Sequence, residues 1–272
     1  MSSTLSTIER VVVPLDGSTS SEAAVAPGVA LAIRLGAVLE LVTARPTFDS
    51  ELAAQYLERI DVALDGDRVH RHVETDETAT NAIVAQADDP AKLVCMATHG
   101  HTGVGDVVFG STAEAVLRAA ERPIVLVGPH CRPLDGFSAD LKVLVCVDGS
   151  ETSESALTLA ELASALGATV RLVVVTIKRD VVDIDPVVEP AQVERLEQLT
   201  NEFRRRAIGA DYEILSGHDV WPPIDAAAEA LPASFLAVVS HARAGVARVL
   251  LGSEATTIVR HSPVPVVAVR TS

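Results

Sequence analysis

Residues 96–112, MATHGHTGVGDVVFGST, combine the end of an apolar strand, a glycine-rich loop and the start of a helix. A second copy, VVSHARAGVARVLLGS at residues 238–253, keeps the His and the closing Gly-Ser but has lost most of the glycines. Backbone N–H groups at a helix start attract phosphate, and glycine lets the backbone approach it closely. The first copy therefore predicts a phosphate site, although Gly-Ser before a helix is also typical of an ordinary N-cap.

The rest of the chain repeats in the same order. VVVPLDGS at residues 11–18 matches VLVCVDGS at residues 143–150, and an apolar run that begins at a proline closes each half, at 123–127 and 263–269. A period near half of the chain is too long for a solenoid repeat and indicates a duplicated domain. We expect a first domain over residues 1–130, a linker over residues 131–138 and a second domain over residues 139–272.

Within each half, β-branched apolar runs alternate with helical stretches. In the first half strands are expected at residues 10–15, 38–43, 69–74, 93–98 and 123–127, and helices at 20–35, 51–64, 78–87 and 112–120. This order predicts an α/β fold of two tandem doubly wound domains, each a five-stranded parallel sheet flanked by helices. The second half carries a longer insertion, residues 178–206, whose Glu and Arg spacing suits a solvated surface helix.

Composition narrows the class of function. The formal net charge of −15, without any basic run, argues against binding to nucleic acid or to an anionic membrane. No apolar run approaches the roughly 20 residues of a membrane span, so we expect a cytoplasmic protein. Cys95, Cys131 and Cys146 form no Cys-x-x-Cys pair, which favours buried free thiols over a disulfide framework or zinc site. Two His-x-His pairs lack a recognisable third ligand, so no protein metal site is predicted.

Three motifs resemble those of the universal stress protein family in its tandem two-domain form. They are Val-Pro-x-Asp-Gly-Ser at residues 13–18, His-Gly followed after nine residues by Gly-Ser at residues 99–111, and the closing strand. The resemblance covers almost the whole chain. One branch of that family binds ATP through a Gly-x-x-Gly, nine-residue, Gly-Ser/Thr loop, and another branch lacks the loop and binds no nucleotide. In the first half the resemblance implies these nucleotide-binding residues: Pro14, Asp16, Ala44, Ala97, Gly100, Gly110, Ser111 and Thr112.

Both halves depart from the ATP-binding pattern. In the first half Ala97 replaces the first loop glycine, which is tolerated only if the backbone there stays strand-like. In the second half Val239 and Ala242 replace the two loop glycines and Cys146 replaces the strand-one proline, so its nucleotide site should be weak or lost. Asp16 has an alternative role, because an Asp before Gly-Ser often just caps the turn that follows.

The sequence favours a stress-response protein that binds ATP, with or without Mg²⁺, in its first domain. Occupancy would change its conformation or the binding of a regulatory protein partner, and hydrolysis would be slow or absent because no general base for the γ-phosphate is recognisable. The alternative is a nucleotide-independent interaction or scaffold protein, supported by Ala97, Val239 and Ala242. In the family the closing strands pair across a dimer axis, so the resemblance implies an intrachain pseudo-dimer or a homodimer.

Overall fold

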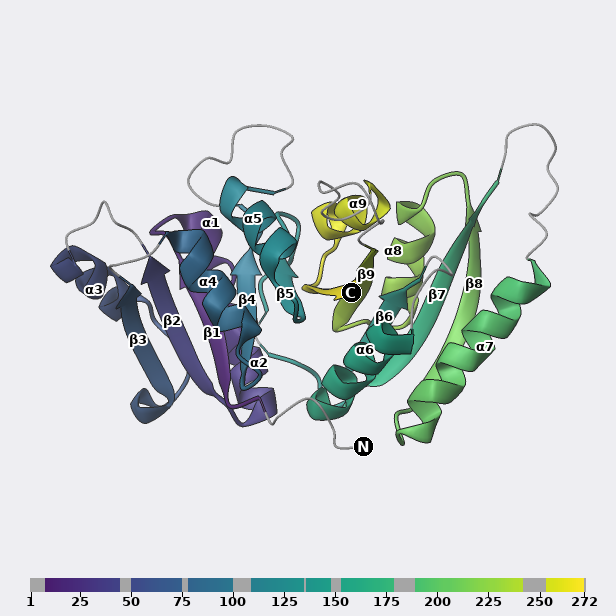
Figure 1. Cartoon of the computed structure of the whole chain (residues 1–272), viewed down its shortest axis with the longest axis horizontal. Helices are drawn as coiled ribbons and strands as arrows, with labels where there is room; N and C mark the ends of the chain where they lie inside the picture. Colours follow the sequence, from purple (N-terminus) through teal and green to yellow (C-terminus); the bar gives the residue numbers. More distant parts are fainter. Residues whose placement is uncertain are drawn as a thin grey trace. The chain divides into compact units, whose positions relative to one another are not determined.

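The computed structural model describes residues 8–44, 50–74, 78–99, 109–134, 136–147, 153–178, 189–241 and 253–271. The chain divides into two compact units, Met1–Phe137 and Ser138–Ser272 (Figure 1). Each unit contains five strands in one parallel sheet, with helices in the connections between them. The expected α/β fold, with its doubly wound five-stranded sheets, is therefore confirmed. None of the helices in these ranges is long and apolar enough to cross a membrane.

Unit 1 alternates strands and helices along the chain. Its strands are β1 Arg10–Leu15, β2 Val38–Ala44, β3 Val69–Glu74, β4 Lys92–Ala97 and β5 Ile124–Val127. Its helices are α1 Thr19–Glu22, α2 Val25–Leu35, α3 Ser50–Arg59, α4 Ala79–Asp88 and α5 Ser111–Ala119, with a 3₁₀ turn η1 at Gly66–Arg68. The strand order is β3-β2-β1-β4-β5.

This order reverses between β1 and β4. The chain builds outward from β1 to β2 and β3, then returns to the other side of β1 for β4 and β5. Right-handed crossovers in the two directions place α1 to α3 on one face of the sheet and α4 and α5 on the other. The carboxyl ends of β1 and β4 therefore form a topological switch point, where doubly wound sheets bind their ligands.

The core of unit 1 is built from small and β-branched side chains. Val11, Val12 and Val13 of β1 are fully buried, as expected for a central parallel strand covered on both faces. Helix α2 lies very close to this strand at Gly28, where an added Cβ would stand 2.4 Å from Cγ2 of Val13. Gly28 thus permits the close helix-to-sheet contact that sets the packing of this face.

Two helices of unit 1 differ from the sequence expectation. The helix expected over residues 20–35 is divided into α1 and α2, because Pro27 has no N–H to continue a helical ladder through Ala23. Ala23 and Ala24 instead donate to carbonyls three residues back. The helix expected over residues 51–64 ends at Arg59, five residues early.

The early end of α3 has a local cause. The guanidinium of Arg71, on β3, donates to the carbonyl oxygens of Leu57 (2.9 Å) and Ile60 (3.3 Å). The N–H of Ile60 bonds the carbonyl of Leu57 in a tightened last turn. The side chain of Arg71 therefore donates to carbonyl oxygens that would accept from backbone N–H groups if the helix continued.

Unit 2 repeats the plan of unit 1. Its strands are β6 Lys142–Cys146, β7 Thr169–Ile177, β8 Ala210–Gly217, β9 Phe235–His241 and β10 Val266–Thr271. Its helices are α6 Ser153–Leu166, α7 Pro190–Arg205, α8 Trp221–Ala230 and α9 Ser253–His261. Its strands lie in the order β8-β7-β6-β9-β10. This is the order of unit 1, with β6 to β10 in the places of β1 to β5.

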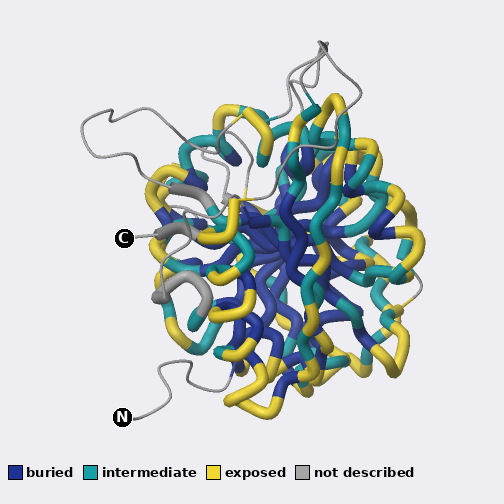
Figure 2. The backbone as a smooth tube through the Cα atoms, turned by 90° about the vertical axis from the view of Figure 1, so that its right-hand side faces the viewer, coloured by how far each residue is buried: buried dark blue, intermediate teal, exposed yellow. Residues whose placement is uncertain are grey.

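Helix α7 corrects one expectation. Residues 178–206 were predicted to lie mainly at the surface, but α7 buries Leu196, Leu199, Thr200 and Phe203. Phe203 is among the largest fully buried side chains of the chain. The Glu and Arg residues occupy the outer side of an amphipathic helix. The prediction considered only the spacing of these charges and overlooked the apolar residues between them. In Figure 2 dark-blue and yellow positions alternate along the outer parts of the chain, whereas its centre is mostly dark blue.

At one equivalent position the two units carry side chains of opposite charge. In unit 1 Glu40 of β2 is 7% exposed and forms ion pairs with Arg10 (3.4 Å) and Lys92 (3.5 Å). In unit 2 the matching residue of β7 is Arg171, which pairs with Asp211 (2.6 Å) and Glu213 (3.4 Å) of β8. The hydrogen bond from Arg171 lowers the pKa of Asp211 below its ordinary value. The duplicated fold has therefore kept a charge pair here while changing its sign.

Candidate functional site

Asp16 follows the last residue of β1 and organises the turn into α1. Its Oδ1 accepts hydrogen bonds from the backbone N–H (2.9 Å) and hydroxyl (2.5 Å) of Ser18. Its own N–H donates to the hydroxyl of Ser21 (3.2 Å), and Ser18 caps α1 by accepting from the N–H of Ser21. The turn-capping role expected for Asp16 is therefore confirmed, and the carboxylate remains partly exposed.

The end of β4 is tied directly to the start of α5. Ala97 is the last residue of β4 and lies opposite Val127 of β5, so the strand-like backbone that tolerance of alanine requires is present. Thr98 is fully buried, and its N–H donates to the carbonyl of Val127 (3.0 Å). Its carbonyl accepts from the N–H of Gly110 (2.7 Å). This bond brings the first turn of α5 to the carboxyl end of β4.

Helix α5 opens without a side-chain cap. Gly110 is the N-cap residue, with φ −68° and ψ 157°, and its carbonyl accepts the first helical bond from Glu114 (2.9 Å). Ser111 is exposed and Thr112 half-buried in the first turn. The N–H groups of a first turn have no partner within their own helix and lie at the positive end of its dipole. This helix start can therefore accept an anion.

The β1–β4 register brings these groups together. Arg10 lies opposite Lys92 and Val12 opposite Val94, so continuing the register places Asp16 beside Thr98. The Asp16 turn and the start of α5 consequently share the switch point between β1 and β4.

Two further predicted site residues lie on β1 and β2, beside this point. Pro14 is half-buried in β1, opposite Val42. Ala44 ends the neighbouring strand β2, opposite Glu74. Gly100 lies outside the described residues.

Sequence reasoning missed two contributors. The buried Thr98 had no signal beyond its place before the His-Gly motif. Tyr56, on α3, donates a hydrogen bond from its hydroxyl to Oε1 of Glu22 on α1 (3.1 Å). Burial, followed by the charge of Glu22, raises the pKa of Tyr56 above its ordinary value. A Tyr and a Glu 34 positions apart give no pattern that a single sequence could reveal.

The histidines near this end have local partners. Nδ1 of His99 lies 2.9 Å from the hydroxyl of Thr98, and Nε2 of His72 lies 3.3 Å from Glu74. In the part of the chain that the structure describes, no group of three or more His, Cys, Asp or Glu side chains is placed to hold a metal ion.

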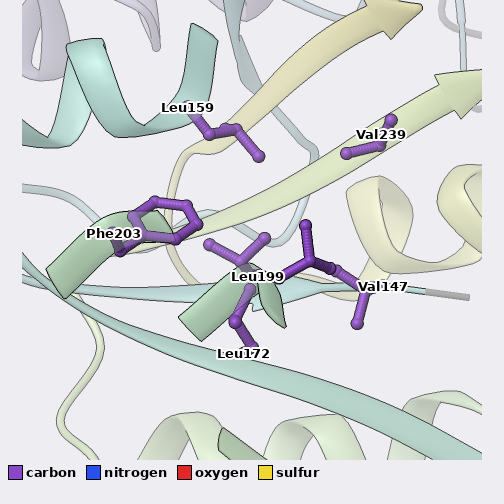
Figure 3. Close-up of a pocket in the computed structure, with 7 residues that line it drawn as sticks. Val147, Leu159, Leu172, Leu199, Phe203 and Val239 are labelled. Carbon is purple, nitrogen blue, oxygen red and sulfur yellow. The ribbon is translucent and has the colours of Figure 1, made fainter. Parts of the chain in front are cut away.

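Unit 2 contains a small apolar pocket in its core. Val239, in the position of Ala97, lines this pocket between the sheet and helices α6 and α7 (Figure 3). The other lining residues are Val145, Val147, Leu159, Leu172, Leu199 and Phe203. Asp148, Ala242 and Gly252 lie outside the described residues, and Ser253 begins α9.

Known proteins match the chain over nearly its full length. The universal stress protein family model matches residues 7–128 and 141–270. A universal stress protein of Mycolicibacterium smegmatis (strain ATCC 700084 / mc(2)155) is 31% identical over 191 residues, 68% of this chain and 63% of that relative. This chain therefore aligns with less than two thirds of that relative's length.

Two solved structures share the fold across both units. A universal stress protein from Archaeoglobus fulgidus DSM 4304 has a TM-score of 0.64 at 18% identity, covering 97% of this chain and 98% of that one. A protein of unknown function from Pseudomonas aeruginosa PAO1 has a TM-score of 0.61 at 16% identity, covering 97% and 92%. At these identities the likeness is one of fold. With both units matched by the family model, the chain belongs to the universal stress protein family, in its tandem two-domain form.

Proposed function

We propose that unit 1 binds an adenine nucleotide, ATP, at the switch point between β1 and β4. The observation that carries this proposal is the hydrogen bond from Gly110 to Thr98, which holds the start of α5 at the carboxyl end of β4, the strand that pairs with β1. A helix N-terminus at this place offers backbone donors and a favourable dipole to phosphate. Membership of a family with an ATP-binding branch adds to this support.

The proposed contacts divide between the two ends of the nucleotide. Gly100, Gly110, Ser111 and Thr112 would receive the phosphates through backbone and hydroxyl donors. Pro14, Asp16, Ala44 and Ala97 would face the nucleoside from the ends of β1, β2 and β4. These assignments follow the motif positions and the arrangement of the strand ends.

A magnesium ion fits this site only as a companion of the phosphates. Asp16 is the one carboxylate among the proposed contacts, and its Oδ1 already accepts two bonds from Ser18. Mg²⁺ takes several waters and substrate phosphates and needs few protein ligands. Asp16 would therefore hold the ion through water.

Binding without rapid turnover is the proposed activity. No general base for an attacking water is recognisable among the proposed contacts, so hydrolysis should be slow. Nucleotide occupancy would then act by changing the conformation of unit 1 or its affinity for a regulatory protein in the cytoplasm. Unit 2 would not bind nucleotide, because Val239 and Ala242 replace the two loop glycines of the ATP-binding pattern.

Titration calorimetry of the full chain with Mg²⁺–ATP tests the proposal. We expect about one ATP per chain, loss of binding in Gly110→Arg and retention in the matched control Gly252→Arg, at the equivalent loop position of unit 2. Thermal unfolding of each variant without ligand checks that both remain folded. No heat and no thermal stabilisation at millimolar ATP would instead favour the nucleotide-independent scaffold. Equal ATP binding by wild type and Gly110→Arg would show that ATP binds away from the start of α5.

A further inference from the structure

Helix α3 is connected to the proposed nucleotide site by a chain of hydrogen bonds. Asp16 bonds Ser18, and Ser18 exchanges bonds with Ser21, whose hydroxyl donates to the Ser18 carbonyl (2.8 Å). Glu22, the residue after Ser21, accepts a hydrogen bond from the hydroxyl of Tyr56 (3.1 Å). Hydrogen bonds and the Ser21–Glu22 peptide link therefore connect a proposed ligand contact to the middle of α3.

The first link depends strongly on Asp16. Helix α1 is a single turn, Thr19–Glu22, and a turn this short depends on its cap for stability. Its cap, Ser18, is itself held by Oδ1 of Asp16 through two hydrogen bonds. A nucleotide or hydrated cation that binds the Asp16 carboxylate would compete with these bonds and shift the turn that carries Glu22.

The last link holds a helix with little apolar anchorage. Of the ten residues of α3, Ala53 and Leu57 are buried. Its counterpart α7 in unit 2 buries Leu196, Leu199 and Phe203 in addition to Thr200. A helix with few buried apolar contacts opens at a low free energy. The bond between Tyr56 and Glu22 is therefore a substantial part of what positions α3 relative to α1.

We propose that α3 is the element through which unit 1 reports nucleotide occupancy, and that the Tyr56–Glu22 hydrogen bond couples it to the site. This inference rests on the proposed nucleotide function and adds the route of its regulation. Tyr56 acts as a positioning residue, through Glu22 and the α1 turn. Coupling is reciprocal, so the factor by which ATP changes the opening equilibrium of α3 is also the factor by which opening of α3 changes ATP affinity.

Hydrogen exchange of the segment 50–59 in the full chain, with and without Mg²⁺–ATP, measures this coupling. In the wild type we expect ATP to change exchange in α3 by about five-fold or more, the lower end of ordinary allosteric couplings. Tyr56→Phe should remove this response. Tyr212→Phe is the matched control, because Tyr212 makes a similar phenol–carboxylate bond to Glu197 (3.3 Å) in unit 2.

Glu22 provides a second pair of variants. Glu22→Gln keeps a side-chain oxygen that can accept from the phenol and should retain most of the α3 response, whereas Glu22→Ala should behave like Tyr56→Phe. If a substitution at Glu22 acted by disrupting the fold, both Glu22→Gln and Glu22→Ala would lower the unfolding temperature and lose the response. Loss of the response in Glu22→Ala alone would point to the missing hydrogen bond instead.

The outcomes separate the two proposals. ATP binding without a change in α3 exchange, or an unchanged response in Tyr56→Phe, would overturn the coupling and leave nucleotide binding intact. Absence of ATP binding in the wild type would overturn both. Loss of the response in Tyr56→Phe and Glu22→Ala, with retention in Glu22→Gln and Tyr212→Phe, would establish the coupling.

Discussion

The backbone N–H of Gly110 donates a 2.7 Å hydrogen bond to the carbonyl oxygen of Thr98, so α5 begins where β4 ends. The bond spans eleven intervening residues, yet it fixes the helix start against a fully buried strand-end residue. Thr98 is in turn bonded to Val127 of β5. The anion-accepting end of α5 is thus set by the sheet.

Ala97, one residue before this contact, should tune ATP affinity according to side-chain size. Ala97→Val reproduces the residue of unit 2 and adds a β-branched side chain at a close-approach position, so affinity should fall by about ten-fold or more, an estimated 1.4 kcal/mol. Ala97→Gly should bind at least as tightly but lose about 0.5–1 kcal/mol of unfolding free energy, because glycine is costly within a strand. Calorimetry and urea unfolding measure the two effects. Equal affinity in Ala97→Val would show that the ligand does not approach this residue.

Gly28 should be a position where even one methyl group is harmful. The Cβ of Gly28→Ala would meet Cγ2 of Val13 at 2.4 Å, and overpacking of this kind costs about 1–3 kcal/mol. Gly66→Ala is the matched control, because nothing lies within 4 Å of its added Cβ. Urea unfolding of both variants should show a large loss for the first and little change for the second. A double variant with Val13→Ala should recover part of the loss, since it removes the clashing methyl groups.

The outline of the fold was predictable because strong local patterns agreed with one another. The β-branched runs, the repeated Asp-Gly-Ser turn and the closing strands placed all five strands of unit 1 within one or two residues. Apart from the division of α1 from α2 near Pro27, which is local, the expectations that failed depended on contacts distant in sequence. The end of α3 is set by Arg71 on another strand, and the buried face of α7 is set by the sheet beneath Phe203. The site was recognised through its motif, whereas Thr98 and Tyr56 became visible only once the strands and helices were assembled.

Glu40 should contribute more to stability than the ion pair that replaces it in unit 2. Glu40→Gln leaves Lys92, whose side chain is only 16% exposed, without its opposite charge. We expect a loss of about 1–3 kcal/mol of unfolding free energy, as for a hydrogen-bonded charge at a partly buried site. Arg171→Gln removes the equivalent charge from the more exposed pair and should cost about 0.2–1 kcal/mol. Chemical unfolding of both variants checks this ranking, and a larger loss in Arg171→Gln would contradict it.

The ion pair of unit 2 should also make stability depend on pH in the acid range. The pKa of Asp211 is lowered in the folded state by its hydrogen bond from Arg171, so the unfolded chain binds the proton more readily. The contribution is therefore present above the ordinary carboxyl value of 3.8 and is lost as pH falls through that value toward the lower folded pKa. Because the Asp211 side chain is 51% exposed, solvent screening should keep the effect below about 1 kcal/mol. Unfolding free energies of wild type and Asp211→Asn, measured from pH 6 down to about pH 3, should converge as pH falls. A gap that stays constant across this range would show that Asp211 stabilises unit 2 without its charge.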